Sequence, residues 1–191
     1  YEVTFDEVWL DHAKALTETT LSEFFDKDEE LFYFTSNTAE ALIARKKEIF
    51  DNVIPSSNAM MATNLYHLGM LLDIEEYTAK ANVMLQRIDR VVTMAPQDLG
   101  HWASFYSQRT YPTAEIAIVS NEPIDDMHKI NEQFIPNKVL VGKKSSDSSG
   151  LALLEGRLLI NKESTFYLCY NKACQLPVNN ANDIFKQLGK S

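Results

Sequence analysis

The chain has 191 residues, of which 45% are hydrophobic, so it can bury a sizeable core as one large domain or two small ones. Its 27 acidic residues outnumber its 18 basic ones, and the formal net charge of -9 at pH 7 disfavours nucleic acid and anionic lipid as partners. No apolar run approaches the roughly 20 residues that span a bilayer, so we expect a soluble region and no membrane contact.

The first part of the chain carries a helical pattern. Apolar residues recur every three or four positions and predict a helix over about 6–25. Residues 31–35 are short, aromatic and flanked by charge, which is typical of a strand or of an extended edge beside a pocket. A short helical turn is expected over 40–43.

Further helices follow a Pro-Ser-Ser-Asn sequence. Either Ser56 or Ser57 can accept a backbone N–H hydrogen bond as an N-cap, and helical spacing of apolar residues follows directly. Two more helical patterns cover 77–91 and 96–106, the latter with a proline suited to a first helical turn. Residues 1–110 therefore predict hairpins of antiparallel helices.

The pattern changes to alternating strands and helices beyond this point. The expected elements are strands over 115–119, 138–141 and 165–170, and helices over 124–134, 151–155 and 182–188. A strand, a helix and a second strand in this order indicate a βαβ-like unit. The predicted fold class is α+β, with helical hairpins over 1–110 followed by a small α/β tail over 111–191.

Several short motifs resemble, in their order, the C-terminal region of the YyaL-like, spermatogenesis-associated thioredoxin-domain proteins. The motifs lie at 34–35, 42–48, 51, 55–58, 151–157 and 169–177. The resemblance implies an upstream thioredoxin-like domain and an (α/α)₆ toroid similar to N-acylglucosamine 2-epimerases and six-hairpin glycosidases. This chain would then be the last part of the toroid plus its tail, and a start at Tyr1 without methionine fits a piece of a longer protein.

Two positions depart from the family pattern. Glu30 and Leu31 stand where the family usually has a Gly-Gly pair, and Ser57 stands where it usually has the glycine of Pro-Ser-Gly-Asn. Each replacement removes backbone freedom that glycine provides. The shape of any family pocket is therefore expected to differ here.

A polar cluster is expected at the start of the capped helix. The predicted ligand-binding residues are Tyr33, Arg45, Asp51, Ser56 and Asn58. In the toroid relatives the ends of inner helices line a sugar cavity, and a guanidinium, a carboxylate, hydroxyls and helix N-terminal N–H groups suit a hydroxyl-rich or anionic ligand. The structural alternative is that Ser56 caps the helix, Asp51 balances a basic neighbour and Asn58 satisfies a turn.

No other set of residues predicts a recognisable reaction. The four histidines are His12, His67, His101 and His128, and we expect packing or hydrogen bonding for each because none has a partner at a telling spacing. Trp102 and Tyr106 are expected in the core. We expect no metal site and no cofactor.

The two cysteines lie close together near the C-terminus. Four residues separate Cys169 from Cys174, which is neither the two-residue gap of a thioredoxin motif nor a full zinc set. We expect reduced structural thiols, with a redox role aided by Lys172 as the alternative. The motif that ends at Gly156 predicts a helix with Glu155 and Arg157 as a docking pair.

The expected function is a contribution to a cavity for a carbohydrate-like or polar small molecule, formed together with the remainder of the full-length chain. The alternative is a non-enzymatic scaffold that presents a partner surface or positions the thioredoxin-like domain. Whether the chain takes part in catalysis stays open at this point. The compartment is undecided, with the cytoplasm as the expected location.

Overall fold

The computed structural model describes residues 1–40 and 44–189. The chain forms two compact units, a helical unit made by Trp9–Thr110 and a sheet unit made by Tyr1–Val8 together with the chain from Tyr111 onward. Helix and sheet both contribute, in agreement with the predicted α+β class. The sequence pattern groups the first eight residues with the helices, whereas in the structure they belong to the sheet unit.

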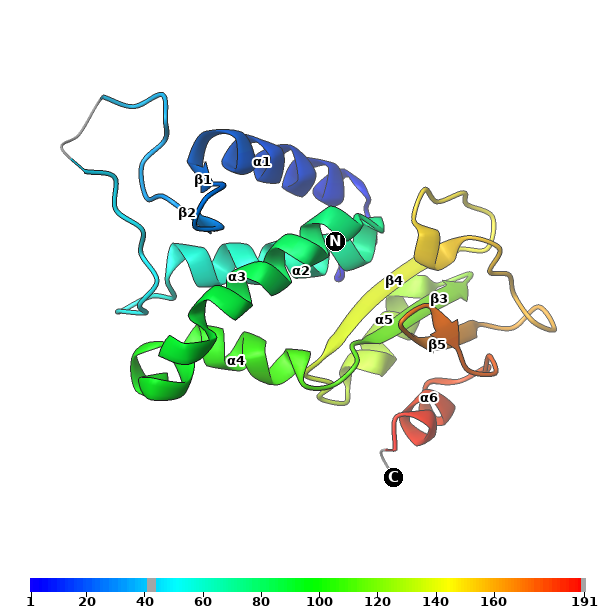
Figure 1. Ribbon diagram of the computed structural model, residues 1–191. Helices are drawn as coiled ribbons and strands as arrows, with labels where there is room; N and C mark the ends of the chain where they lie inside the picture. Colours follow the sequence, from blue (N-terminus) through cyan, green and yellow to red (C-terminus); the bar gives the residue numbers. More distant parts are fainter. Residues whose placement is uncertain (41–43, 190–191) are drawn as a thin grey trace. The chain divides into compact units, whose positions relative to one another are not determined.

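The helical unit runs from blue to green in Figure 1. Its helices are α1 (Val8–Phe24), α2 (Ser57–Leu72), α3 (Glu75–Met94), the 3₁₀ turn η1 (Pro96–Asp98) and α4 (Gly100–Arg109). After α1 the chain forms a short antiparallel pair, β1 (Phe25–Asp26) with β2 (Leu31–Phe32). The helices predicted over 6–25 and 77–91 are confirmed, whereas the turn predicted over 40–43 falls mainly on 41–43, outside the described residues.

Helix α2 begins and ends as its sequence dictates. The Ser56 hydroxyl accepts the Ala59 N–H at 3.3 Å, which confirms the predicted N-cap. At the other end Asp73 adopts a left-handed conformation with φ 57°, and the chain turns directly into α3. Gly69 permits close packing there, because a Cβ on it would lie 2.7 Å from the Thr78 Cγ2 atom.

The proline predicted to open a helix opens a 3₁₀ turn instead. The Leu99 N–H bonds back to the Pro96 carbonyl at 3.3 Å, and Leu99 itself leaves the helical region at φ -139°. Helix α4 therefore starts afresh at Gly100. The core of the helical unit includes the fully buried side chains of Leu65, Met84, Ile88, Leu99, Trp102 and Phe105.

The sheet unit is built on a four-stranded sheet of order β4-β3-β5-β6. Its elements are β3 (Ala114–Ser120), α5 (Pro123–Asn131), β4 (Lys138–Lys144), the 3₁₀ turn η2 (Ala152–Leu154), β5 (Thr165–Tyr170), β6 (Ala173–Cys174) and α6 (Ala181–Gln187). Strands β3 and β4 are parallel and joined through α5, so the predicted βαβ unit is confirmed, whereas β5 and β6 are antiparallel to their neighbours.

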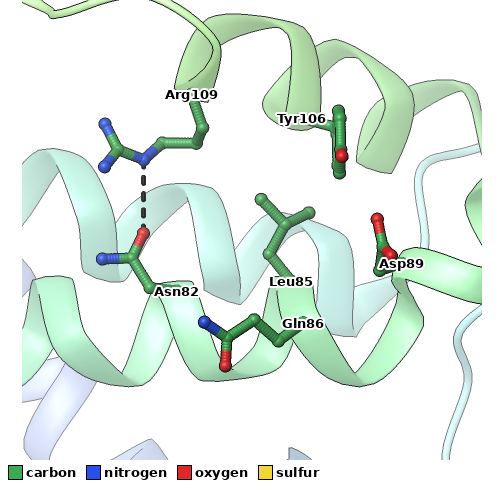
Figure 2. A pocket seen from close by; sticks show the side chains of 6 residues that line it. All are labelled: Asn82, Leu85, Gln86, Asp89, Tyr106 and Arg109. Atoms are coloured by element: carbon green, nitrogen blue, oxygen red, sulfur yellow. Dashed lines mark hydrogen bonds between the residues drawn. The ribbon is translucent and has the colours of Figure 1, made fainter.

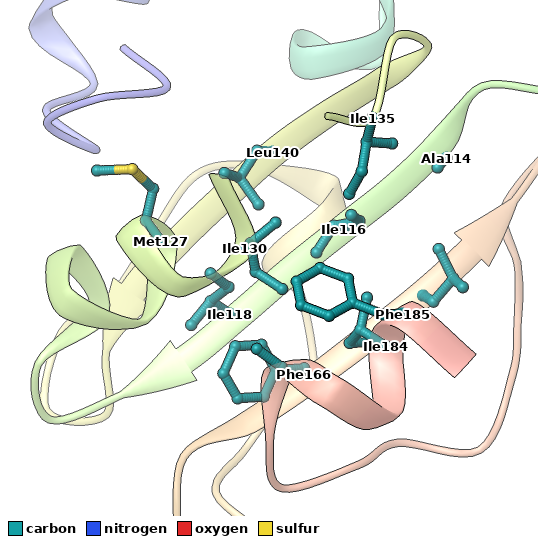
Figure 3. Close-up of a cluster of buried hydrophobic side chains, with 12 residues drawn as sticks. Ala114, Ile116, Ile118, Met127, Ile130, Ile135, Leu140, Phe166, Ile184 and Phe185 are labelled. Atoms are coloured by element: carbon teal, nitrogen blue, oxygen red, sulfur yellow. The ribbon is translucent and has the colours of Figure 1, made fainter. Parts of the chain in front are cut away.

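One face of the sheet carries the main apolar core (Figure 3). Ile116 of β3 lies between Leu140 of β4 and Leu168 of β5, so all three side chains point to this face. Helices α5 and α6 cover it with residues that include Ile130 and Ile184. Alternation along the strands therefore sends Glu115 and Cys169 to the opposite face.

The segment 151–157 is not the predicted helix. Only η2 is helical, because Glu155 is extended at ψ 132° and Gly156 has φ 66°, a conformation that glycine adopts without strain. Leu151 and Leu154 are buried there. Arg157 contacts Tyr167 and Cys169 of the same unit.

The first residues of the chain pack onto the sheet unit. The Glu2 carboxylate accepts the Leu140 N–H at 2.7 Å, and the Phe5 ring occupies the space where any side chain at Gly142 would project. Gly142 thus admits an aromatic ring onto β4. None of the helices in the described ranges has the length and apolar character required of a membrane span.

Candidate functional site

Asn58, one of the predicted ligand-binding residues, is fully buried at the start of α2. Its Oδ1 atom accepts the Phe32 N–H at 2.7 Å, and its Nδ2 donates to the Phe32 carbonyl at 2.9 Å and to the Glu48 carbonyl at 2.9 Å. The amide therefore bonds to the Phe32 backbone of β2 as a neighbouring strand would. It also holds β2 and the segment at Glu48 against the helix.

Asp51 joins the starts of two helices. One carboxylate oxygen accepts the Ser56 N–H at 2.8 Å, immediately before α2, and the other accepts the His101 N–H at 2.7 Å in the first turn of α4. Free N–H groups at a helix start favour a carboxylate in this position. Asp51 and Ser56 thus lie together, and their hydrogen bonds are those of helix capping.

Tyr33 and Arg45 form a second set with different neighbours. The Arg45 guanidinium lies 4.0 Å from the Tyr33 ring centre and donates to the backbone carbonyls of Thr35 and Glu23. The Tyr33 hydroxyl donates to Asp26 at 2.7 Å. Contacts therefore pair Arg45 with Tyr33 and Asp51 with Ser56, whereas Asn58 bonds to neither pair.

Lys47 completes the set around Tyr33. Its ammonium bonds to Asp26 at 2.5 Å and to Glu29, and it lies 4.4 Å from the Tyr33 ring centre. The Lys47 hydrogen bond, followed by that from Tyr33, holds the pKa of Asp26 well below its usual range. The hydrogen bond to Asp26 in turn raises the pKa of Tyr33. The set is a compact network of opposite charges around an aromatic ring.

Two open pockets adjoin Asp51. One, of about 330 Å³, is lined by residues that include Asp51, Pro55, His101 and Ser104. The other, of about 460 Å³, is lined by the continuous segment 46–52 and by Phe34. Asp51 borders both pockets, but its two oxygens are already committed to the helix starts.

A third pocket lies between α3 and α4 (Figure 2) and was not predicted. Its volume is about 480 Å³, and its lining residues are Asn82, Leu85, Gln86, Asp89, Tyr106 and Arg109. Figure 2 shows Asn82 and Arg109 at one end, Tyr106 and Asp89 at the other, and Leu85 between them. We call it the α3–α4 pocket.

The cationic end of the α3–α4 pocket is fixed by hydrogen bonds. Arg109 donates through Nε to Asn82 at 3.2 Å and through Nη1 to the Tyr66 hydroxyl, and its guanidinium lies 4.2 Å from the Tyr66 ring centre. These contacts orient the planar group and leave its remaining N–H groups for another acceptor.

The other polar side chains of the pocket are uncommitted. Within the described part of the chain, the side chains of Gln86, Asp89 and Tyr106 form no hydrogen bond or ion pair with one another or with other residues. Tyr106, expected in the core, is 39% exposed, whereas Trp102 is buried as expected and donates to the Ile49 carbonyl. The pocket thus offers an amide, a carboxylate and a phenol to an incoming molecule.

A signal for the α3–α4 pocket is present in the sequence. Its α3 residues stand at positions i, i+3, i+4 and i+7, which is one face of a helix, and three of these four are polar: Asn82, Leu85, Gln86 and Asp89. Such a face is more often a solvated helix surface, so it is a weak signal for a pocket.

Two of the histidines, His101 and His12, contact neighbouring side chains. The His101 Nε2 atom lies 3.1 Å from the Thr63 hydroxyl, and the His12 ring packs edge-on to Trp9. Across residues 1–40 and 44–189, no three His, Cys, Asp or Glu side chains are grouped as metal ligands.

The expectation of reduced cysteines is wrong, because Cys169 and Cys174 form a disulfide. Strands β5 and β6 pair antiparallel with these two residues directly opposite each other. Asn171 and Lys172 make the turn between them with positive φ angles of 50° and 65°. The i, i+5 spacing across a two-residue turn was the sequence signal for this pairing.

Comparison with known proteins gives weak similarity to spermatogenesis-associated protein 20. No family model matches the chain. It is 24% identical to spermatogenesis-associated protein 20 of Homo sapiens and 23% identical to its counterpart in Mus musculus, in each case over 98% of this chain and 25% of the relative. The chain therefore spans about a quarter of the length of the curated relatives it matches.

Proposed function

We propose that this chain is the C-terminal part of a larger thioredoxin-domain-containing protein and contributes the wall of a cavity for a carbohydrate-like or other polar small molecule. The place within a larger protein is supported by the alignment, which covers most of this chain but a quarter of the relative. The helical unit would be one section of an α/α toroid. Its support is the succession of α2, α3 and α4, packed as neighbouring helices.

The observation that carries the ligand proposal is the set of uncommitted polar groups in the α3–α4 pocket. Asp89 and Tyr106 lie opposite the fixed guanidinium of Arg109, across the apolar surface of Leu85, and Gln86 also lines the pocket. Convergent polar groups around a partly apolar hollow are typical of small-molecule sites.

The chemistry of this lining suits hydroxyl groups. An amide and a carboxylate can each form paired hydrogen bonds to neighbouring hydroxyls, while the face of Tyr106 can pack against the C–H side of a sugar ring. The pocket contributes a single carboxylate, Asp89, whereas glycoside hydrolysis requires two. These features support binding by this chain, with any catalytic partner supplied from elsewhere.

The five predicted residues remain a separate proposal for the same class of ligand. Asp51 is their best-placed member because it borders two pockets, and Arg45 presents a cation stacked on Tyr33. Asn58 and Ser56 are buried, so direct contact with a ligand would require the loops around them to move.

Thermal shift with a panel of monosaccharides, disaccharides and sugar phosphates tests the proposal. A ligand at about ten times its Kd stabilises a protein of this size by about 1.4 kcal/mol, or about 4 °C. We expect Asp89→Asn to abolish the shift and the matched Asp98→Asn variant, outside the pocket, to retain it. Loss in Arg45→Ala with retention in Asp89→Asn would move the site to the predicted cluster.

The alternative, a non-enzymatic interaction region, is supported by the exposed apolar loop before α2. Val53 is 95% exposed and Ile54 72% exposed, which is unusual for neighbouring branched apolar residues in a loop. Absence of any thermal shift across the panel, from protein that melts cooperatively, would favour this alternative over the ligand proposal.

A further inference from the structure

We propose that the Cys169–Cys174 disulfide is an exchange-active redox site. In this proposal a dithiol reductant attacks Cys174, Cys169 leaves as a thiolate, and the guanidinium of Arg157 stabilises that thiolate. The inference goes beyond small-molecule binding and rests on a different unit of the chain.

The two sulfur atoms differ in access to solvent. Cys169 lies within β5 and is 0% exposed, whereas Cys174 ends β6 and belongs to an exposed run at the edge of the sheet. Thiol–disulfide exchange requires the attacking thiolate to reach one sulfur along the bond axis. Access therefore selects Cys174 as the attacked sulfur and Cys169 as the leaving one.

A cation lies beside both sulfurs. The Arg157 Nη2 atom is 3.1 Å from the Cys169 sulfur and 3.4 Å from the Cys174 sulfur. The guanidinium is held there by stacking at 4.7 Å from the centre of the Tyr167 ring. Neighbouring positive charge lowers the pKa of a thiol, and a thiol of lower pKa leaves faster from a disulfide.

The hairpin closed by the disulfide is short, and the chain just beyond it is held to β5 by the Gln175 N–H, which bonds to the Leu168 carbonyl at 2.9 Å. Beyond the cysteines, the β5–β6 pairing consists of Tyr170 opposite Ala173, and the turn is held by the Lys172 N–H, which lies 3.2 Å from the Glu115 carboxylate. Opening the disulfide removes the covalent link across this short pair. The oxidised and reduced hairpins therefore differ in how firmly β6 stays on the sheet.

The reaction is balanced with the dithiol as the stated co-reactant. Its first thiolate bonds to the Cys174 sulfur, and the electron pair of the broken disulfide passes to Cys169. The second thiolate of the dithiol then attacks the dithiol sulfur that is bonded to Cys174, which releases Cys174 as a thiolate. The dithiol is oxidised to a disulfide, two electrons reach the protein, and the protons lost by the dithiol neutralise whichever cysteine thiolates take them up.

The first test maps the position of attack in the unmodified protein. Incubation with reduced glutathione, a monothiol, followed by acid quenching and mass spectrometry should find the adduct on Cys174. An adduct mainly on Cys169, or two free thiols in protein isolated without reductant, would overturn the proposal. This measurement needs no variant and so does not depend on one folding.

The second test measures the role of the cation. We expect Arg157→Gln to slow reduction by dithiothreitol about three- to tenfold, because the leaving thiol loses its neighbouring charge. Arg157→Lys should recover part of the rate, and Arg87→Gln, an exposed arginine on α3, should match the unaltered chain. A rate unchanged in Arg157→Gln, or reduction that occurs only on unfolding, contradicts the proposed exchange.

Discussion

The helical unit and the sheet unit are held together in different ways. In the helical unit, single polar side chains reach backbone groups of elements distant in sequence, as Asn58 does with Phe32 and Asp51 does with α4. In the sheet unit, a continuous apolar layer between the sheet and two helices includes Phe166 and Ile184. The comparison predicts that loss of a single polar anchor such as Asn58 is costly in the helical unit, and that loss of apolar volume such as the Phe166 ring is costly in the sheet unit.

The largest effect is expected from a cavity in the sheet unit. Phe166→Ala removes a fully buried ring between β5 and the covering helices, which should cost about 3–5 kcal/mol of unfolding free energy. Chemical denaturation followed by circular dichroism measures the loss. Leu176→Ala, at an 84% exposed position, is the control and should change stability little. Equal losses of unfolding free energy in Phe166→Ala and Leu176→Ala would contradict the dependence of the sheet unit on buried apolar volume.

A smaller but still large effect is expected from one amide in the helical unit. Asn58→Ala leaves two buried backbone groups of Phe32 and the partly buried Glu48 carbonyl without their partner and should cost about 3 kcal/mol. Hydrogen exchange of the Phe32 N–H should accelerate in parallel. Asn52→Ala, at an exposed loop position, serves as the matched control. A loss below about 1 kcal/mol would show that polar anchoring is not what orders this unit.

The smallest effect concerns Glu115, a carboxyl that is buried in the sheet unit and whose burial lowers the stability of the fold. Burial raises the pKa of Glu115 from the ordinary 4.5, although the Lys172 N–H and the charge of Arg157 oppose this. The folded state therefore holds its proton more tightly than the unfolded state, and ionised Glu115 destabilises the fold at neutral pH.

Glu115→Gln should accordingly stabilise the protein at pH 7 by up to about 1 kcal/mol. The gain should shrink as pH falls through the raised pKa towards 4.5, where the native carboxyl is itself protonated. Melting temperatures of both proteins between pH 4 and 8 measure this. A gain that grows as pH falls would contradict the assigned direction.

Local patterns predicted most of the elements. Residues 165–170 were expected as a strand and form β5 over the same range, and Ser56 caps α2 as the Pro-Ser-Ser-Asn sequence indicates. Both features depend on neighbours within a few residues, which is the information that periodicity and capping rules contain. Helix α4 begins at Gly100, later than predicted, because a 3₁₀ turn at Pro96 has the same sequence signature as a helical first turn.

The candidate sites were predicted less well because they depend on distant pairs. Asn58 bonds to a residue 26 positions earlier, and Asp51 to one 50 positions later, so no local rule distinguishes an anchor from a ligand contact. The α3–α4 pocket likewise needs the pairing of two helices before its polar residues meet. The disulfide requires a two-residue turn that places Cys169 opposite Cys174, and the spacing of the two cysteines alone does not determine this strand register.

The segment that follows the β5–β6 turn covers the outer edge of the sheet. Cys174 pairs with Cys169, the Gln175 N–H bonds to the Leu168 carbonyl at 2.9 Å, and Val178 bridges to Phe166. An exposed strand edge is a template on which another chain can add a strand, so this cover protects the sheet from intermolecular association. The disulfide fastens one end of the cover, so the tendency of the protein to self-associate depends on how reducing its surroundings are.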